Sequence, residues 1–384
     1  MASNKKVWFL FLGALFLAFH YALIIYVNSS FLKQFMDERV IGYLYMAGSI
    51  VSVALFLNAG KILHYLGNLR SFGLFLLLEL VSTVGIFFST GPLLASLAFI
   101  LHQAVISFVF YNLDIFLERE QLQEENTGNR RGAFLTFQNI AWICAPLLSG
   151  IIINQFGIEA VYIIASFLII PPAIIIGQTF TRGLHKPQKV LDTKGIYTFL
   201  KDKGDLKRIL LSNILLQFFY ATMVIFLPIL LTRDLGFDWQ STGIIFAIML
   251  LPFLILEWPL GYIADRKLGE REILGFGFAV ISVSTALIPL VSQVSILIWA
   301  GILFATRIGA SAVEIGNETY FFRQVKERDA AIIGIFRTTR PLAYIIAPLF
   351  ASIVLNFTGN RGLFAVLALL TLLGLFFIPK RDTK

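Results

Sequence analysis

The sequence predicts an all-α membrane protein with twelve transmembrane helices. Three observations predict it: an apolar composition, twelve apolar stretches of membrane length, and an uneven distribution of lysine and arginine. The chain has 384 residues, of which 58% are hydrophobic and only 14% are charged. Its mean hydropathy is +0.81. A soluble protein carries about 25% charged residues because its surface faces water, so this composition excludes a water-soluble fold.

Each of the twelve stretches is long enough to cross a bilayer, which takes about 20 apolar residues in a helix. The first follows Lys5 and Lys6 and is too long for the core of a signal peptide, so we expect a retained helix. The first six cover residues 7–30, 39–59, 70–88, 93–117, 131–154 and 158–180. The second six cover residues 207–232, 238–262, 271–290, 294–320, 330–355 and 360–379.

Most connections between the stretches are short, so neighbouring helices are predicted to be antiparallel. The segment 181–206 is the exception, because it is long, polar and basic and contains Pro187. It separates six stretches from six. We therefore predict an N-terminal six-helix bundle over 1–180, a cytoplasmic linker over 181–206 and a C-terminal six-helix bundle over 207–384.

The positive charges predict the orientation, because cytoplasmic loops are enriched in lysine and arginine. With both termini placed in the cytoplasm, 24 of the 31 lysines and arginines fall on the inner side, four in outer loops and three within helices. The predicted location is the plasma (inner) membrane. This bias also accounts for the net charge of +8 without nucleic-acid binding.

The two halves of the chain resemble each other at a spacing of about 200 residues. The paired features are Ala145–Leu147 with Ala347–Leu349, Gly42–Gly60 with Gly243–Gly261, and Tyr21 with Tyr220. Each half has an even number of spans, so both halves enter the membrane from the same side. Parallel repeats of this kind are typical of transporters whose site lies between two rocking halves.

A basic loop is predicted after the second and the eighth span. The second copy contains Gly261, Asp265, Arg266, Gly269 and Arg271, and it resembles the loop signature G-x-L-x-D-R-x-G-R-K of the major facilitator superfamily. The first copy keeps Gly60, Gly67 and Arg70 but has His64 at the aspartate position. The resemblance implies that these glycines and charged residues form a cytoplasmic gate. Glu257 stands one turn before Gly261 and two turns before Asp265, so we expect it to belong to the same gate.

The resemblance covers the whole chain and implies further features. The fifth span carries a degenerate copy of the family's antiporter pattern at Gly132, Ala141, Ala145-Pro146 and Ser149-Gly150. In lipid, small residues also serve simply to let helices pack closely, so both interpretations stay open. The family further implies that Arg70 pairs with Asp114 or Glu118, that Arg271 pairs with Glu318, and that the protein is a monomer.

Charged residues inside predicted helices are costly and need a reason. In the tenth span, Arg307, Glu314 and Glu318 fall on one helix face. In the eleventh, Arg337 and Arg340 are three residues apart and therefore neighbours. Only the carboxylates can titrate there. We therefore expect Glu314 and Glu318 to couple protons and the three arginines to bind substrate. A fixed ion-pair lock is the alternative.

The first half offers fewer ionisable residues. His20 is a further candidate for proton coupling, since histidine titrates in the physiological range. Asp114 is another candidate. We expect His102 to be a buried neutral histidine with a hydrogen bond, and Glu79 to have a structural partner. The remaining candidates for substrate binding are Gln138, Tyr21, Tyr220 and Asn112, chosen because each has a counterpart in the other half.

These features predict a secondary active transporter that works by alternating access. The sequence has no nucleotide-binding motif and no catalytic motif, so we expect neither an enzyme nor a cofactor or metal site. The favoured activity is proton-coupled efflux of an amphiphilic or drug-like compound, from the fifth-span pattern and 38 phenylalanines. The alternatives are organic-anion uptake or exchange, and a non-transporting sensor or lipid-handling protein. The expected partners are a small-molecule substrate, protons and the lipid bilayer.

Overall fold

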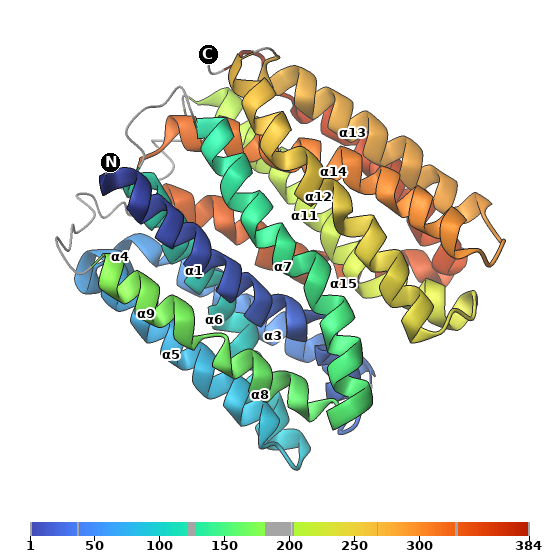
Figure 1. Ribbon diagram of the computed structural model, residues 1–384. Helices are drawn as coiled ribbons and strands as arrows, with labels where there is room; N and C mark the ends of the chain where they lie inside the picture. The colour runs from blue at the N-terminus through green and yellow to red at the C-terminus, as the bar shows by residue number, and fades with distance from the viewer. Residues whose placement is uncertain are drawn as a thin grey trace. The chain divides into compact units, whose positions relative to one another are not determined.

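The computed structural model describes residues 2–36, 38–120, 127–180, 201, 203–266, 268–326 and 329–382. Within these residues the regular structure is entirely helical (Figure 1). The chain divides into two compact units. The first comprises residues 1–122, 140–198 and 325–345, and the second comprises residues 123–139, 199–324 and 346–384. Two long helices, α7 (Thr127–Phe156) and α15 (Ala330–Leu372), therefore contribute their first parts to one unit and the rest to the other.

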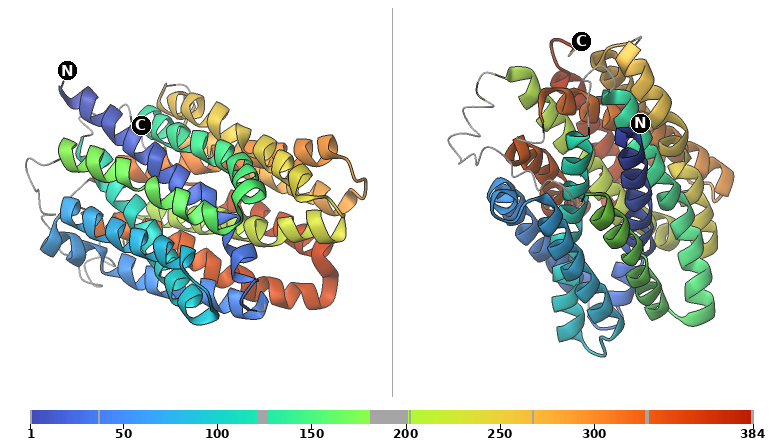
Figure 2. Two further views of the ribbon diagram at one scale, coloured as in Figure 1. Left: turned by 60° about the horizontal axis from the view of Figure 1, so that its bottom comes forward. Right: turned by 60° about the vertical axis from the view of Figure 1, so that its left-hand side comes forward.

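The first unit is a helical bundle in which α6 (Pro92–Arg119) packs against α5 (Asn68–Phe87) and α3 (Glu38–Leu57). On the other side, α1 (Ala2–Ile25) lies along α8 (Glu159–Phe167) and α9 (Ile170–Thr179) (Figure 2). The short helices α2 (Asn28–Leu32) and α4 (Ala59–Leu66) follow α1 and α3. Stacked phenylalanines such as Phe75 and Phe108, with ring centroids 4.4 Å apart, fill the space between α5 and α6.

The second unit is built around α14 (Ile296–Gln324), which contacts α11 (Gly204–Ile229), α12 (Trp239–Arg266) and α13 (Glu270–Leu287) (Figure 1). The backbones of α13 and α14 nearly touch, because a Cβ atom at Gly309 would lie 2.5 Å from the carbonyl oxygen of Gly277. Short segments extend α11, α13 and α15: they are η2 (Leu230–Asp234), η3 (Ile288–Leu290) and η5 (Leu373–Phe377).

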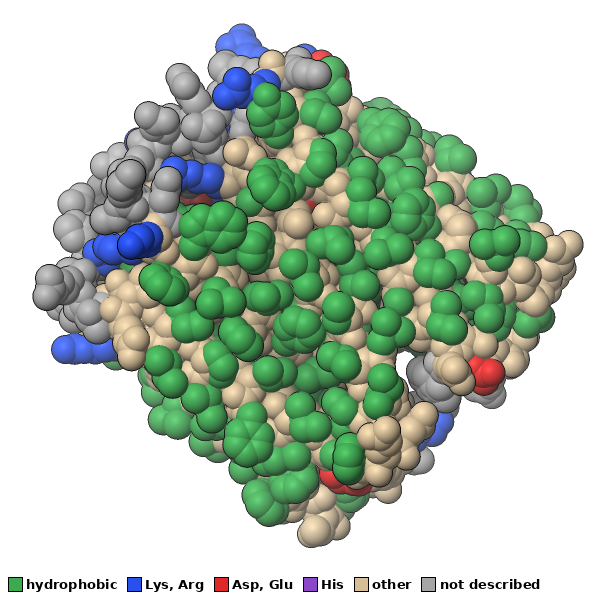
Figure 3. Space-filling view, in the orientation of Figure 1, with side chains coloured by type: hydrophobic (Ala, Val, Ile, Leu, Met, Phe, Trp, Pro, Cys, Tyr) green, Lys and Arg blue, Asp and Glu red, His purple; other side chains and the backbone are tan. Residues whose placement is uncertain are grey.

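Eleven helices in the described residues are long and apolar enough to cross a membrane, and Arg361–Phe377 forms a shorter apolar helix. The eleventh and twelfth predicted spans are two helices that meet at a kink within α15, at Gly359, whose φ of 66° and ψ of −178° are not helical. Many large apolar side chains are exposed, including Leu297 at 81% and Phe376 at 74%. Figure 3 shows such side chains covering a whole face, with lysine and arginine gathered toward one edge. The chain is an integral, multi-pass membrane protein.

Local structure differs from the prediction at the first basic loop. Most of Gly60–Arg70 is helical, since α4 continues to Leu66 with Ala59 and Leu63 buried. The chain turns at Gly67, whose φ of 75° favours glycine because other side chains are strained there. The second copy is helical as far as Arg266, the last residue of α12. The predicted sixth span is divided into α8 and α9, and α9 begins with a proline in its first turn.

Candidate functional site

In the second unit, Arg307, Glu314 and Tyr220 lie together between α11 and α14. The hydroxyl of Tyr220 donates a hydrogen bond to Oε2 of Glu314 at 2.7 Å. Arg307 is only 3% exposed. Its guanidinium carbon lies 5.2 Å from the ring centroid of Phe219 and 5.9 Å from that of Tyr220. The helix face predicted for Arg307 and Glu314 therefore meets the aromatic run of α11.

A third carboxylate belongs to this region. Glu257 of α12 is 1% exposed, and it interacts electrostatically with both Glu314 and Glu318. Nδ2 of Asn139, from α7, donates a hydrogen bond to Oε2 of Glu257 at 2.5 Å. The sequence predicted Glu257 as a gate residue but gave no partner for it, because Asn139 lies 118 residues away in the chain.

Glu318 is 3% exposed and lies 3.8 Å from Nη1 of Arg131, measured at Oε2. Arg131 comes from α7, and its guanidinium carbon stands 3.3 Å above the ring centroid of Phe322. The resemblance implied Arg271 as the partner of Glu318. Arg271 is exposed, and its backbone N–H donates to Oδ1 of Asp382 at 3.1 Å. Sequence reasoning did not single out Arg131 as an ion-pair partner.

Glycines allow α7 and α12 to approach closely. A Cβ atom at Gly132 would lie 2.5 Å from the carbonyl oxygen of Glu257, and one at Gly261 would lie 2.2 Å from that of Gly128. A related contact occurs in the first unit, where a Cβ at Gly60 would lie 2.9 Å from the Cβ of Ala331. Gly60 and Gly261, both predicted as gate residues, thus occupy similar helix crossings.

The other predicted gate residues differ in exposure and backbone geometry. Arg70 and Arg266 are exposed. Gly269 has extended backbone geometry and precedes α13. The side chain of Asp265 lies outside the described part of the chain.

In the first unit, Arg337 of α15 binds Asp114 of α6 through two hydrogen bonds. Nε donates to Oδ2 at 2.6 Å and Nη2 donates to Oδ1 at 3.0 Å. The Asp114 side chain is 4% exposed and that of Arg337 is 24% exposed. Two parallel hydrogen bonds between these groups fix both side chains. The family resemblance implied that Arg70 pairs with Asp114 or Glu118, and the sequence analysis assigned Arg337 to substrate binding.

Arg340, one turn further along α15, donates a hydrogen bond from Nη2 to the hydroxyl oxygen of Tyr21 at 3.2 Å. Tyr21 is 5% exposed and belongs to an aromatic cluster. Its ring centroid lies 5.5 Å from that of Trp142 and 6.0 Å from that of Phe110. The structure therefore brings together two predicted substrate-binding residues, Arg340 and Tyr21.

Three ionisable residues that the sequence treated separately form one buried cluster. Oε1 of Glu79, on α5, lies 2.7 Å from Nε2 of His20 on α1 and 2.6 Å from Nδ1 of His102 on α6. All three side chains are fully buried. The prediction that Glu79 has a structural partner did not identify either histidine. The available signal was that an uncompensated glutamate is costly inside a membrane.

Two other predicted substrate-binding residues make local contacts. Nδ2 of Asn112 donates to the carbonyl oxygen of Phe108 at 2.7 Å, and the carbonyl oxygen of Asn112 accepts a hydrogen bond from Nδ2 of Asn68. Asn112 is fully buried where α5 meets α6. Gln138 is 9% exposed, and its Nε2 lies 3.5 Å from the carbonyl oxygen of Phe134.

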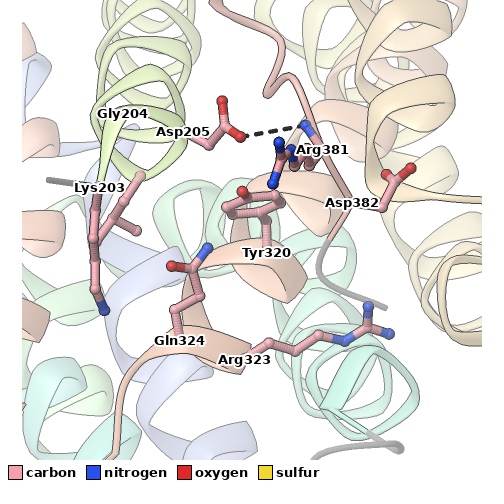
Figure 4. A pocket seen from close by; sticks show the side chains of 9 residues that line it. Lys203, Gly204, Asp205, Tyr320, Arg323, Gln324, Arg381 and Asp382 are labelled. Carbon is pink, nitrogen blue, oxygen red and sulfur yellow. Dashed lines mark hydrogen bonds between the residues drawn. The ribbon is translucent and has the colours of Figure 1, made fainter.

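A polar hollow of about 400 Å³ lies where α11 begins and α14 ends (Figure 4). Its lining includes Lys203, Tyr320, Arg323 and Arg381. Oδ2 of Asp205 accepts a hydrogen bond from the backbone N–H of Arg381 at 3.3 Å. In the described residues, no three His, Cys, Asp or Glu side chains are arranged to hold a metal ion.

Comparisons with known proteins agree with this helical architecture. Residues 209–384 match the sequence profile of the Major Facilitator Superfamily. This match covers 176 of the 384 residues, all of them in the C-terminal part of the chain. The predicted resemblance to the superfamily is thereby confirmed. No curated protein sequence matches the chain.

Two solved structures illustrate the likeness. The human organic anion transporter MFSD10 (TETRAN) superposes with a TM-score of 0.78 at 16% identity, over 98% of this chain and 99% of that one. A bacterial homologue of the iron transporter ferroportin, in an outward-facing state, also gives 0.78 at 16% identity, over 97% and 98% of the two chains. At this identity the likeness concerns the fold alone.

Proposed function

We propose that the protein is a secondary active transporter that exports a small amphiphilic compound in exchange for protons bound at Glu314. The observation that carries the proposal is the Tyr220–Glu314 hydrogen bond, which lies two turns from the buried Arg307. A carboxylate can gain and lose a proton, whereas arginine stays charged. An amphiphilic solute would find a cation and aromatic faces beside this titrating group.

We assign the N-terminal parts of α7 and α15 to the cytoplasmic gate. Asp114 and Arg337 belong to different predicted six-helix halves, and so do Asn139 and Glu257. These contacts hold the predicted cytoplasmic ends of the halves together and break when that side opens. Arg337 accordingly belongs to the ion pair that holds this gate closed, and it does not bind substrate. We further propose that both termini lie in the cytoplasm, that the protein is a monomer, and that it resides in the plasma (inner) membrane.

Proton movement in proteoliposomes tests the function. Vesicles that hold the purified full-length protein and an internal pH-sensitive dye are given a panel of lipophilic cations and organic anions. We expect at least one compound to change the internal pH in wild type and not in Glu314→Gln. Glu272→Gln is the matched control, because Glu272 is exposed and caps α13 through Gly269, a bond that glutamine can also make.

Transport without a change of internal pH would contradict the proposal. If compounds accumulate or exchange in wild type while the internal pH stays constant, the protein is a uniporter or exchanger and Glu314 is part of a lock. Tyr220→Phe gives a second check, because it removes only the hydroxyl that bonds Glu314. We expect this variant to shift the pH dependence of transport.

Organic-anion transport is the second candidate. It is favoured by Arg307 and Arg340, which both lie against tyrosine rings within 6 Å, and by the fold shared with an organic anion transporter. Guanidinium groups are well suited to carboxylate and phosphate recognition. If this candidate is correct, Arg307→Ala abolishes uptake of organic anions. If the protein exports hydrophobic compounds, their efflux survives the substitution.

A further inference from the structure

The cluster of His20, Glu79 and His102 joins three helices of the first unit. One carboxylate oxygen, Oε1 of Glu79, faces a ring nitrogen of each histidine at 2.7 and 2.6 Å. All three side chains have zero exposure. Buried ionisable groups at membrane depth are costly and mark function unless they are fully paired. In this cluster one ring nitrogen has no hydrogen-bond partner among the described residues, as the placement of the protons shows.

The hydrogen bonds fix most of the protons. Nδ1 of His20 lies 2.9 Å from the carbonyl oxygen of Ala165, and a carbonyl oxygen only accepts, so Nδ1 carries a proton. Nε2 of His20 shares a second proton with Glu79, which resides on one partner or the other. Oε1 of Glu79 has no second proton to give, so we assign Nδ1 of His102 as the donor of a third proton to this oxygen. In either arrangement the three side chains together are neutral.

One basic atom remains. Nε2 of His102 is buried, and it has no hydrogen-bond partner among the described residues. With a proton on Nδ1, this nitrogen keeps a free lone pair, and neutral imidazole accepts protons in the physiological pH range. The carboxylate of Glu79 bonds the same ring and would stabilise the resulting cation.

We propose that His20, Glu79 and His102 form a buried proton-binding site that takes up one proton at Nε2 of His102. The new N–H bond changes the charge of the cluster from zero to +1, and no other bond breaks. The site is separate from Glu314 and would give the first six-helix half its own titrating group. A role in driving transport rests on the function proposed above, whereas binding of the proton does not.

The surroundings link the site to α15. The ring centroid of Tyr21 lies 6.0 Å from that of His102. Tyr21 in turn interacts electrostatically with Glu79, with Tyr45 of α3, and with Arg340 and Tyr344 of α15. Of these neighbours, Arg340 is permanently charged. Like charges repel, so a proton on His102 weakens the Arg340–Tyr21 contact.

Neutral polar groups complete the environment of Glu79. Oγ of Ser82 lies 3.5 Å from Oε2 of Glu79. Thr83 and Ser166 bond each other at 3.1 Å. None of these hydroxyls titrates in the physiological range, so they do not compete for the proton.

Nitrogen NMR of the histidine rings tests the proposal without any solute. The sequence has four histidines, at positions 20, 64, 102 and 185, so full-length protein labelled with ¹⁵N-histidine gives few signals. His64→Gln and His185→Gln identify the signals of two rings, and His20→Gln then separates the signals of His20 from those of His102. We expect His102 at pH 8.5 to show one protonated and one bare nitrogen. As the pH falls to 5.5, the bare-nitrogen signal should disappear.

Glu79→Gln tests the role of the carboxylate. Glutamine cannot share a proton with Nε2 of His20 as the carboxylate does, so the pH at which His102 takes up its proton should change. Glu272→Gln, at the exposed start of α13, should leave it unchanged.

The titration of His102 in the wild-type protein tests the proposal by itself, even if Glu79→Gln does not fold. A bare Nε2 on His102 throughout pH 5.5–8.5 overturns the proposal, and so does a transition that Glu79→Gln leaves in place. Because no solute is present, neither result depends on the Glu314→Gln transport assay. The two proposals can therefore fail separately.

Discussion

The pair formed by Arg337 and Asp114 shows how single residues carry structure inside this protein. The two hydrogen bonds are 2.6 and 3.0 Å long, and the carboxylate is almost fully buried. Removing one partner of such a pair leaves a buried charge with less compensation. The Tyr21 hydroxyl and Arg340 form a second, longer contact one turn away on α15.

We predict that Arg337 and Asp114 are energetically coupled. Residues in direct contact show interaction energies of about 0.5–3 kcal/mol in double-mutant cycles. Wild type, Asp114→Asn, Arg337→Gln and the double variant are compared by unfolding of the purified protein in detergent. The double variant should be less destabilised than the sum of the two single variants. Strictly additive losses would show that the pair contributes no coupling.

At the scale of helices, small residues decide where α7 and α12 cross. A Cβ at Gly261 would lie 2.2 Å from the carbonyl oxygen of Gly128, which is a backbone atom and cannot rotate away. Close helix approach through glycine is common in membranes. The same crossing positions Asn139 beside Glu257.

We predict that Gly261→Ala separates these helices and destabilises the protein by about 1–3 kcal/mol, the usual cost of overpacking. The matched control is Gly243→Ala in the same helix, where a Cβ would meet nothing within 4 Å. Alanine favours helix by up to about 1 kcal/mol over glycine, so the control should be neutral or stabilising. Melting temperatures in detergent measure both. Equal effects would reject the crossing as the cause.

At the scale of the whole molecule, the distribution of lysine and arginine predicts the orientation in the membrane. Cys144 is the only cysteine, so Cys144→Ala provides a background for single-cysteine labelling. Ser292→Cys should react with a membrane-impermeant maleimide added to intact cells, because its loop is predicted to be external. Leu268→Cys should react only after the cells are opened. Both positions are exposed, and the reverse pattern would invert the predicted topology.

Much of the helical framework could be predicted from the sequence. The apolar stretches agree closely with the helices, for example 93–117 with Pro92–Arg119 and 294–320 with Ile296–Gln324. Hydropathy over about 20 residues is a local property, so it can be read from neighbouring residues. The helical α4 was missed because the glycine and lysine at its start resemble a loop.

The sequence by itself determined the helices, the repeat and the residue types available for chemistry. Only the tertiary structure decided which of these residues meet. Glu79 binds His20 from 59 residues away, and Asp114 binds Arg337 from 223 residues away. Such contacts depend on the rotation of each helix about its axis and on its depth beside its neighbours. Both are set by side-chain packing between distant segments, which no local pattern contains.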